Sequence, residues 1–120
     1  MNTKLLGRWG EAQAAAYLKK QGYRVLAMGY RTRYGDLDIV AQTGKLIVFV
    51  EVKLRRGDSF APARDHVTPV KQERLKTTAG MWLAREDCEL PCRFDVIEVY
   101  APQGTETRNP VINHIEDAFQ

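Results

Sequence analysis

The chain has 120 residues, of which 44% are hydrophobic and 28% are charged, and its formal net charge is +3. This balance is typical of one soluble globular domain over residues 1–120, and it excludes a disordered tail, a collagen-like rod and a membrane protein. The first residues are not followed by the apolar stretch of a secretory signal, so we expect a cytoplasmic protein. Cys88 and Cys92 are the only cysteines, and we interpret them as reduced structural residues rather than as a zinc site.

The predicted elements follow the order αβββαββ, which indicates a small mixed α/β domain. Helices are predicted over residues 3–21 and 69–85, where apolar residues recur at helical spacing, with Thr68 as the N-cap of the second helix. Two segments rich in Gly, Pro and polar residues, 55–67 and 101–110, are predicted to be loops. Alternating or continuous apolar runs predict strands over residues 23–28, 36–41, 45–53, 92–100 and 111–115.

The hairpin formed by the second and third predicted strands carries several charged side chains. With a tight turn at residues 43–44, the pairing places Asp36 opposite Glu51. Residues directly opposite each other share a face of the sheet, and the other face of this hairpin is apolar and is expected to pack on a helix. The polar side chains predicted to share one face are Asp36, Asp38, Glu51 and Lys53.

Carboxylates that lie opposite each other repel, so this cluster needs a compensating cation. Lys53 supplies one positive charge, and a divalent metal supplies two. Hard carboxylate oxygens suit Mg²⁺ or Mn²⁺, and the combination of carboxylates, a lysine and such a metal is suited to hydrolysis of a phosphodiester. The alternative is a structural salt bridge between Lys53 and either Glu51 or Asp36.

Glu11 is a further candidate ligand, because it lies among small and apolar neighbours on the first predicted helix. We expect this carboxylate to be partly buried, where it either serves as an additional metal ligand or pairs with Arg8 or Lys4. Asp95, in the middle of a predicted strand, is interpreted as a structural partner of Arg93 or of a neighbouring strand. The apolar stripe predicted for the first helix consists of Leu5, Trp9, Ala12 and Ala16.

The charge is distributed unevenly along the chain. The first 85 residues carry 16 basic and 7 acidic side chains, whereas the last 35 carry 2 and 8. A basic region of this kind favours a polyanionic partner, nucleic acid first, although a basic surface that only solvates the fold is the alternative. The candidate phosphate contacts are Arg31, Arg33, Arg55, Arg56, Arg64, Lys71 and Arg74.

Five strings spread over nearly the whole chain carry a family resemblance. They are GRWGE at 7–11, AYL at 16–18 with GY at 22–23, GDLDIVA at 35–41, LIVFVEVK at 46–53 and RFDV at 93–96. Together they resemble the YraN-like family of predicted nucleases and, through it, the PD-(D/E)xK, or restriction-endonuclease-like, superfamily.

The resemblance implies a three-layer fold around a mixed central sheet, with Asp38 and Glu51 as metal ligands and Lys53 as the cation that positions the attacking water. The twelve residues between Asp38 and Glu51 resemble the spacing in archaeal Holliday-junction resolvases. Those enzymes carry a similar helical acid at the position of Glu11. The family pattern commonly shows Gly-Glu-Ile-Asp where this chain has GDLD at 35–38, so the role of Asp36 stays open.

These observations predict a metal-dependent endonuclease acting on DNA, including branched or junction DNA. Asp38, Glu51 and Glu11 are the predicted ligands of Mg²⁺ or Mn²⁺, and Lys53 completes the catalytic set. A homodimer would match the two-fold symmetry of branched DNA. Two other function classes stay open: a non-catalytic nucleic-acid-binding module that retains the fold, and a protein-interaction module that uses its acidic residues 86–120.

Overall fold

The computed structural model describes residues 3–57 and 67–120 and has the predicted order of elements. Most of the predicted loop over 55–67 lies outside the described residues. None of the helices in the described ranges has the length and apolar character needed to cross a membrane. The elements are α1 (Thr3–Lys20), β1 (Arg24–Thr32), β2 (Gly35–Thr43), β3 (Leu46–Arg55), α2 (Pro69–Arg85), β4 (Cys92–Tyr100), the 3₁₀ turn η2 (Gly104–Glu106) and β5 (Val111–Phe119).

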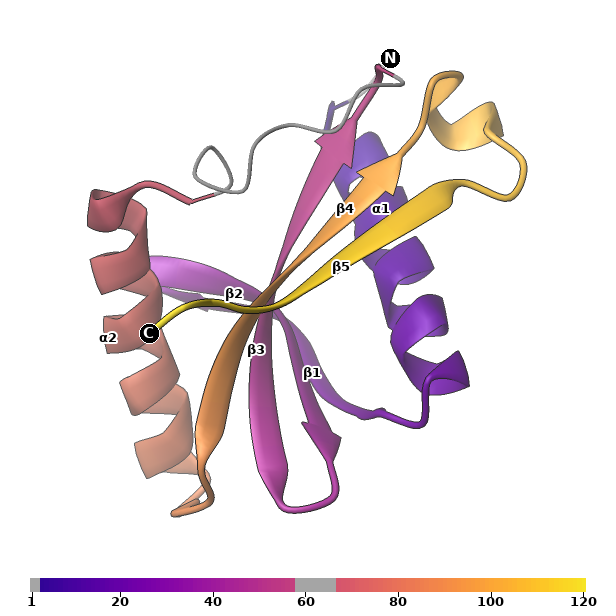
Figure 1. Cartoon of the computed structure of the whole chain (residues 1–120). Coiled ribbons are helices and arrows are strands. Elements are labelled where there is room, and N and C mark those ends of the chain that lie inside the picture. The colour runs from indigo at the N-terminus through magenta and orange to yellow at the C-terminus, as the bar shows by residue number, and fades with distance from the viewer. Residues whose placement is uncertain (1–2, 58–66) are drawn as a thin grey trace.

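The five strands form one mixed sheet in the order β1-β2-β3-β4-β5. Strands β3 and β4 are parallel and are connected through α2, while the other neighbours are antiparallel. Helix α1 packs on one face of the sheet and α2 on the other, so the domain has three layers (Figure 1). The expected three-layer α/β architecture with a mixed central sheet is confirmed, and it is compatible with the restriction-endonuclease-like fold.

Each face of the sheet has its own hydrophobic cluster. The apolar face of the central hairpin packs on α1, as predicted. The α1 cluster contains Ala14, Ala15 and Leu18 with Ile39, Ala41, Val48, Val50, Ile97 and Val99. The α2 cluster contains Leu75, Ala79 and Trp82 with Leu37, Val40, Ile47, Phe49, Val67 and Val96.

The predicted apolar stripe of α1 is wrong except at Trp9, which packs against the α1 cluster. Leu5 is 57% exposed, and Ala12 and Ala16 are exposed as well. The helix instead turns its smallest side chains to the sheet, because they permit a close approach of the backbone. A Cβ atom at Gly10 would lie 3.0 Å from the side chain of Leu54. The buried face is therefore the one that also carries Glu11.

The turn between β2 and β3 lies one residue later than predicted. Thr43 pairs with Leu46, so Gly44 and Lys45 form the turn, and Gly44 adopts a φ of 58°. A positive φ at the first turn residue is accessible to glycine without steric cost, which fixes this position of the turn. Moving the turn by one residue keeps even-numbered positions opposite odd-numbered ones, so the predicted faces near the turn are preserved. The predicted pairing of Asp36 with Glu51 is wrong, because β2 and β3 pair only from the turn to Ile39 and Val50, and Asp36 pairs with Arg31 of β1.

Four strands run further than predicted. Strand β1 extends to Thr32, β2 to Thr43, β3 to Arg55 and β5 to Phe119. Their additional residues find backbone partners in neighbouring strands, which local sequence does not reveal. As a result Arg31 and Arg55 lie on strands rather than in loops.

Strands β2 and β3 separate halfway along the sheet. Their pairing ends at Ile39 and Val50, after which β2 continues with β1 and β3 continues with β4. In Figure 1 the β1–β2 hairpin turns toward α2, whereas β3, β4 and β5 run on together. Leu37 accordingly packs in the α2 cluster and not on the predicted face with Ile39. We call the point of separation, marked by Asp38 and Glu51, the sheet fork.

Candidate functional site

Asp38 lies at the sheet fork and bridges the two separating strands. Its Oδ2 accepts a hydrogen bond from the backbone N–H of Val52 at 2.8 Å. The side chain thereby takes the place of a strand partner for a partly buried backbone donor. Burial, and next the negative charge of Glu51, raise the pKa of Asp38 to about 7. This carboxyl group therefore exchanges its proton near neutral pH.

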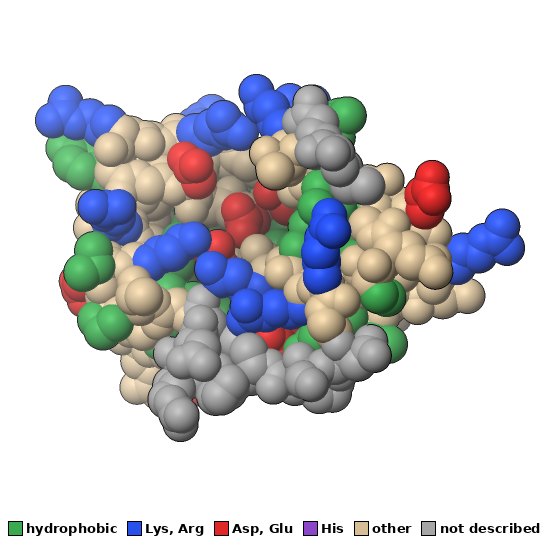
Figure 2. All heavy atoms as spheres, turned by 90° about the horizontal axis from the view of Figure 1, so that it is seen from above, with side chains coloured by type: hydrophobic (Ala, Val, Ile, Leu, Met, Phe, Trp, Pro, Cys, Tyr) green, Lys and Arg blue, Asp and Glu red, His purple; other side chains and the backbone are tan. Residues whose placement is uncertain are grey.

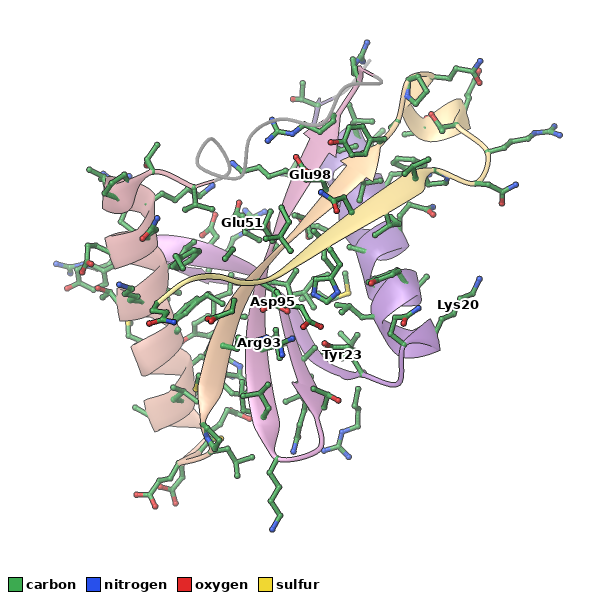
Figure 3. All side chains as sticks on the ribbon, viewed as in Figure 1. Lys20, Tyr23, Glu51, Arg93, Asp95 and Glu98 are labelled. Atoms are coloured by element: carbon green, nitrogen blue, oxygen red, sulfur yellow. The ribbon has the colours of Figure 1, made fainter. Side chains whose placement is uncertain are left out.

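Glu51 lies on the other side of the fork, on β3, and is only 7% exposed. Its Oε1 accepts a hydrogen bond from Nζ of Lys71 at 2.8 Å. Figure 3 shows Glu51 in the space between the sheet and α2. The ion pair of Glu51 is therefore with Lys71 on α2, twenty residues away in sequence, and not with Lys53, the cation that the structural alternative named.

Lys53 follows Glu51 on β3 by two residues, so the two side chains leave the strand on the same face. It lies beside Glu98, its Cα partner on β4. Burial, and next the positive charge of Lys71, lower the pKa of Lys53, while Glu51 and Asp38 oppose this shift. Two ammonium groups therefore approach the same pair of carboxylates.

Glu11 reaches the fork region from α1. Burial, and next the charge of Glu51, raise the pKa of Glu11, whereas Arg31 and Arg8 act in the opposite direction. Within residues 3–57 and 67–120, no three His, Cys, Asp or Glu side chains are close enough together to hold one metal ion. The described structure thus joins Asp38 and Glu51 at the fork and keeps Glu11 beside them as a nearby charge.

Two open clefts flank the fork. One, of about 910 Å³, separates it from α2, and its lining includes Asp36, Asp38, Glu51, Arg33, Lys71 and Arg74. The other, of about 580 Å³, lies between α1 and β1, and its lining includes Lys4, Arg8, Glu11 and Arg31. Figure 2 shows acidic side chains in a hollow with Lys and Arg side chains around it. An acidic floor with a basic rim suits a phosphate that a cation bridges to the protein.

The basic residues predicted to contact phosphate differ in the contacts that their side chains make within the protein. Arg33 lies 5.1 Å from the ring centre of Tyr34, and both residues line the larger cleft. Arg56 is exposed directly after β3. Arg55 is bound within the fold, because its Nε donates to Oε2 of the fully buried Glu98 at 2.9 Å. Arg64 lies outside the described residues.

Asp95 has the structural role that its mid-strand position indicated. The buried carboxylate accepts two hydrogen bonds from Arg93, both at 2.7 Å, and one from the backbone N–H of Asp117 at 3.0 Å. It also bonds to Nε2 of His114 at 2.8 Å, and the other ring nitrogen bonds to Tyr17 on α1. Figure 3 labels Asp95 and Arg93 close together, away from Glu51. This network ties β4, β5 and α1 together.

Comparison with known proteins places these residues in a family. The family model described as "Uncharacterised protein family UPF0102" matches residues 10–99, a range that includes Glu11, Asp38, Glu51 and Lys53. A UPF0102 protein of Geotalea uraniireducens is 41% identical over 120 residues, which cover 99% of this chain and 92% of that protein. A relative from Symbiobacterium thermophilum is 46% identical over 98 residues, covering 81% and 83%, and one from Mycolicibacterium gilvum is 44% identical over 114 residues, covering 92% and 90%.

Proposed function

The chain belongs to the UPF0102 family, and we propose that it is a metal-dependent nuclease of the PD-(D/E)xK type that hydrolyses DNA at the sheet fork. One observation carries this proposal. Two carboxylates from separating strands, Asp38 and Glu51, converge in a cleft with a basic rim, and Lys53 leaves β3 on the same face as Glu51. A buried carboxyl group beside a like charge in a cleft, with its pKa raised as that of Asp38 is, is typical of functional sites.

The residues of the fork fit a hard divalent cation. Asp38 and Glu51 offer carboxylate oxygens, which Mg²⁺ and Mn²⁺ prefer, and such ions retain several waters when the protein supplies only one or two carboxylates. We assign these two residues as the ligands, with Glu11 acting on the ion through its charge or through water. When bound, the ion supplies a Lewis acid for the phosphoryl group and offsets the repulsion between the two acids.

The remaining side chains position the substrate. Lys53 holds the attacking water and places a positive charge beside the phosphoryl oxygens, where negative charge develops in the transition state. The bond from Val52 fixes the orientation of the Asp38 carboxylate. Arg33 and Arg74 on the rim hold phosphates on either side of the scissile bond, and such contacts carry no sequence information.

The decisive experiment offers linear duplex, single-stranded and four-way-junction DNA to the purified protein with Mn²⁺. We expect cleavage by the wild type and by the control Glu89→Gln, which removes an exposed carboxylate in the turn before β4. Asp38→Asn and Lys53→Met should each slow cleavage by about 10²-fold or more, as expected for groups that act on the transition state. Unchanged cleavage by both variants would contradict the assigned site.

Other outcomes favour the other function classes. DNA binding that weakens steeply with salt, without cleavage of any substrate, would favour a nucleic-acid-binding module. No DNA affinity at moderate salt would favour a protein-interaction module. Preferential cleavage of the junction, together with a dimer in sedimentation analysis, would support the proposed branched substrate and homodimer.

A further inference from the structure

Lys71 occupies an unusual position for a cation. It is the third residue of α2, whose N-cap is Thr68 and whose first residue is Pro69, and the Thr68 hydroxyl accepts from the Lys71 backbone N–H at 3.2 Å. The N-terminal end of a helix carries partial positive charge, so acidic residues are favoured there and lysine is disfavoured. The first turn of α2 contains no acid. The charge of Lys71 therefore does not stabilise this helix, and its role lies in another contact.

The nearest explanation is Glu51, whose carboxylate accepts from Nζ of Lys71 at 2.8 Å. The two ends of this pair differ in their surroundings, because Glu51 is 7% exposed whereas Lys71 is 44% exposed. Lys71 also lines the larger cleft together with Arg33 and Arg74. One ammonium group thus lies within reach of both a buried carboxylate and the space where a phosphate would enter.

We propose that Lys71 couples the binding of a nucleic-acid phosphate to the binding of a divalent metal at the fork. The inference rests on the proposed function, because it takes Glu51 as a metal ligand. A phosphate in the cleft competes with Glu51 for the Lys71 ammonium, and Oε1 of Glu51 then becomes available to the metal. A metal on Glu51 conversely releases Lys71 to the phosphate. Each ligand therefore tightens the other by the same factor.

The test measures binding rather than turnover. A fluorescent duplex is titrated with the protein in the absence of divalent cations and with saturating Ca²⁺, a hard cation that also prefers oxygen ligands. For the wild type we expect Ca²⁺ to tighten DNA binding by about fivefold or more, the lower end of common coupling factors. Lys71→Met should lower this factor by about twofold or more, because the competing ammonium is gone and only direct contact between the ion and the phosphate still couples the two ligands.

Two further variants make the result specific. Lys76→Met removes an ammonium from the same helix, where it pairs with Glu73 at 3.5 Å, and should retain the wild-type coupling. Lys71→Gln keeps a hydrogen-bond donor to Glu51 but lacks the charge, so it should lower the coupling factor as Lys71→Met does. It also provides the measurement if Lys71→Met does not fold, which circular dichroism would show.

Each result either supports or contradicts the proposed role of Lys71. Equal coupling in the wild type and in both Lys71 variants would overturn the role of Lys71, as would the absence of any coupling in the wild type. If the proposed metal site at the fork is wrong, a different measurement shows it. In that case Asp38→Asn would leave the Ca²⁺ affinity of the free protein unchanged, whatever Lys71 does.

Discussion

The carboxylate of Asp38 accepts a 2.8 Å hydrogen bond from the backbone N–H of Val52, across the point where β2 leaves β3. The ionised form of the same group is disfavoured, since burial and the charge of Glu51 raise its pKa to about 7. The oxygen of Asp38 thus stabilises the fold by accepting a backbone hydrogen bond, whereas its negative charge destabilises the fold. These two effects can be separated by substitution.

Replacing Asp38 by asparagine should stabilise the metal-free protein at high pH. The folded-state pKa lies above the unfolded value of about 3.9, so the folded state holds the extra proton and the contribution of this group to stability is lost as pH rises through about 7. Asparagine keeps an oxygen acceptor for Val52 and has no charge. Urea denaturation should show the advantage of Asp38→Asn growing from pH 5 to pH 8, and a constant difference would contradict the charge effect.

Replacing Asp38 by alanine separates the hydrogen bond from the charge. Alanine also lacks the charge, but it leaves the Val52 N–H without its side-chain acceptor. We expect Asp38→Ala to be less stable than Asp38→Asn by about 1–3 kcal/mol, the usual cost of an unsatisfied buried polar group. The same denaturation series measures this difference, and equal stabilities would mean that water replaces the carboxylate.

Divalent metal should stabilise the protein in a pH-dependent way. A ligand that binds only the folded state at a hundred times its Kd adds about 2.7 kcal/mol to the free energy of unfolding. Protons compete with metal for Asp38, so Mn²⁺ should raise the melting temperature more at pH 8 than at pH 6. Asp38→Asn and Glu51→Gln should lose the effect and Glu89→Gln should keep it, as scanning calorimetry would show.

Arg93→Met should destabilise the fold without affecting the fork. It leaves the charge of Asp95 buried with fewer donors, and breaking such a pair commonly costs about 3–5 kcal/mol. Although burial raises the pKa of Asp95, hydrogen bonds from His114 and Arg93 lower it overall. The stabilisation is therefore present above the unfolded pKa and is lost as pH falls through the folded value, so the loss should shrink in acid. If Arg93→Met lost as much stability in acid as at neutral pH, or had an altered Mn²⁺ affinity, this role of Arg93 would be contradicted.

Removing cations from the rim should weaken DNA binding at low salt most strongly. Each phosphate contact contributes about one unit to the slope of log K against log salt, so Arg33→Gln combined with Arg74→Gln should reduce the slope by about two. Lys20→Gln serves as the control, because Lys20 points outward from the far end of α1 (Figure 3). Equal slopes for the pair and for the control would place the DNA elsewhere.

The order of elements followed from the sequence because each signal is local. The Thr68 cap, the Pro69 at the helix start and the continuous apolar run of β3 act within a few positions. The buried face of α1 could not be predicted from the sequence, because small residues such as Ala14 are buried through close backbone approach and not through hydrophobicity. The end of β3 at Arg55 depends on pairing with β4, a long-range contact.

The convergence of Asp38 and Glu51 could be predicted, but the cation that pairs with Glu51 could not. The two acids were expected on one face, and both line the larger cleft, although the pairing of β2 with β3 ends before it reaches them. Lys71 was expected to contact phosphate, and its bond to Glu51 depends on how α2 crosses the sheet. The one sequence signal for it was a lysine in the first turn of a helix, where the dipole disfavours it.

The fork also means that the two acids belong to different parts of one sheet. Asp38 belongs to the β1–β2 arm and Glu51 to the β3–β4–β5 arm, while the pairs from Ile39–Val50 to Thr43–Leu46 form the stem that joins them. The angle between the arms sets the separation of the carboxylates. Side chains packed on the stem, such as Val40 opposite Phe49, therefore influence from a distance the gap that the proposed cation would span.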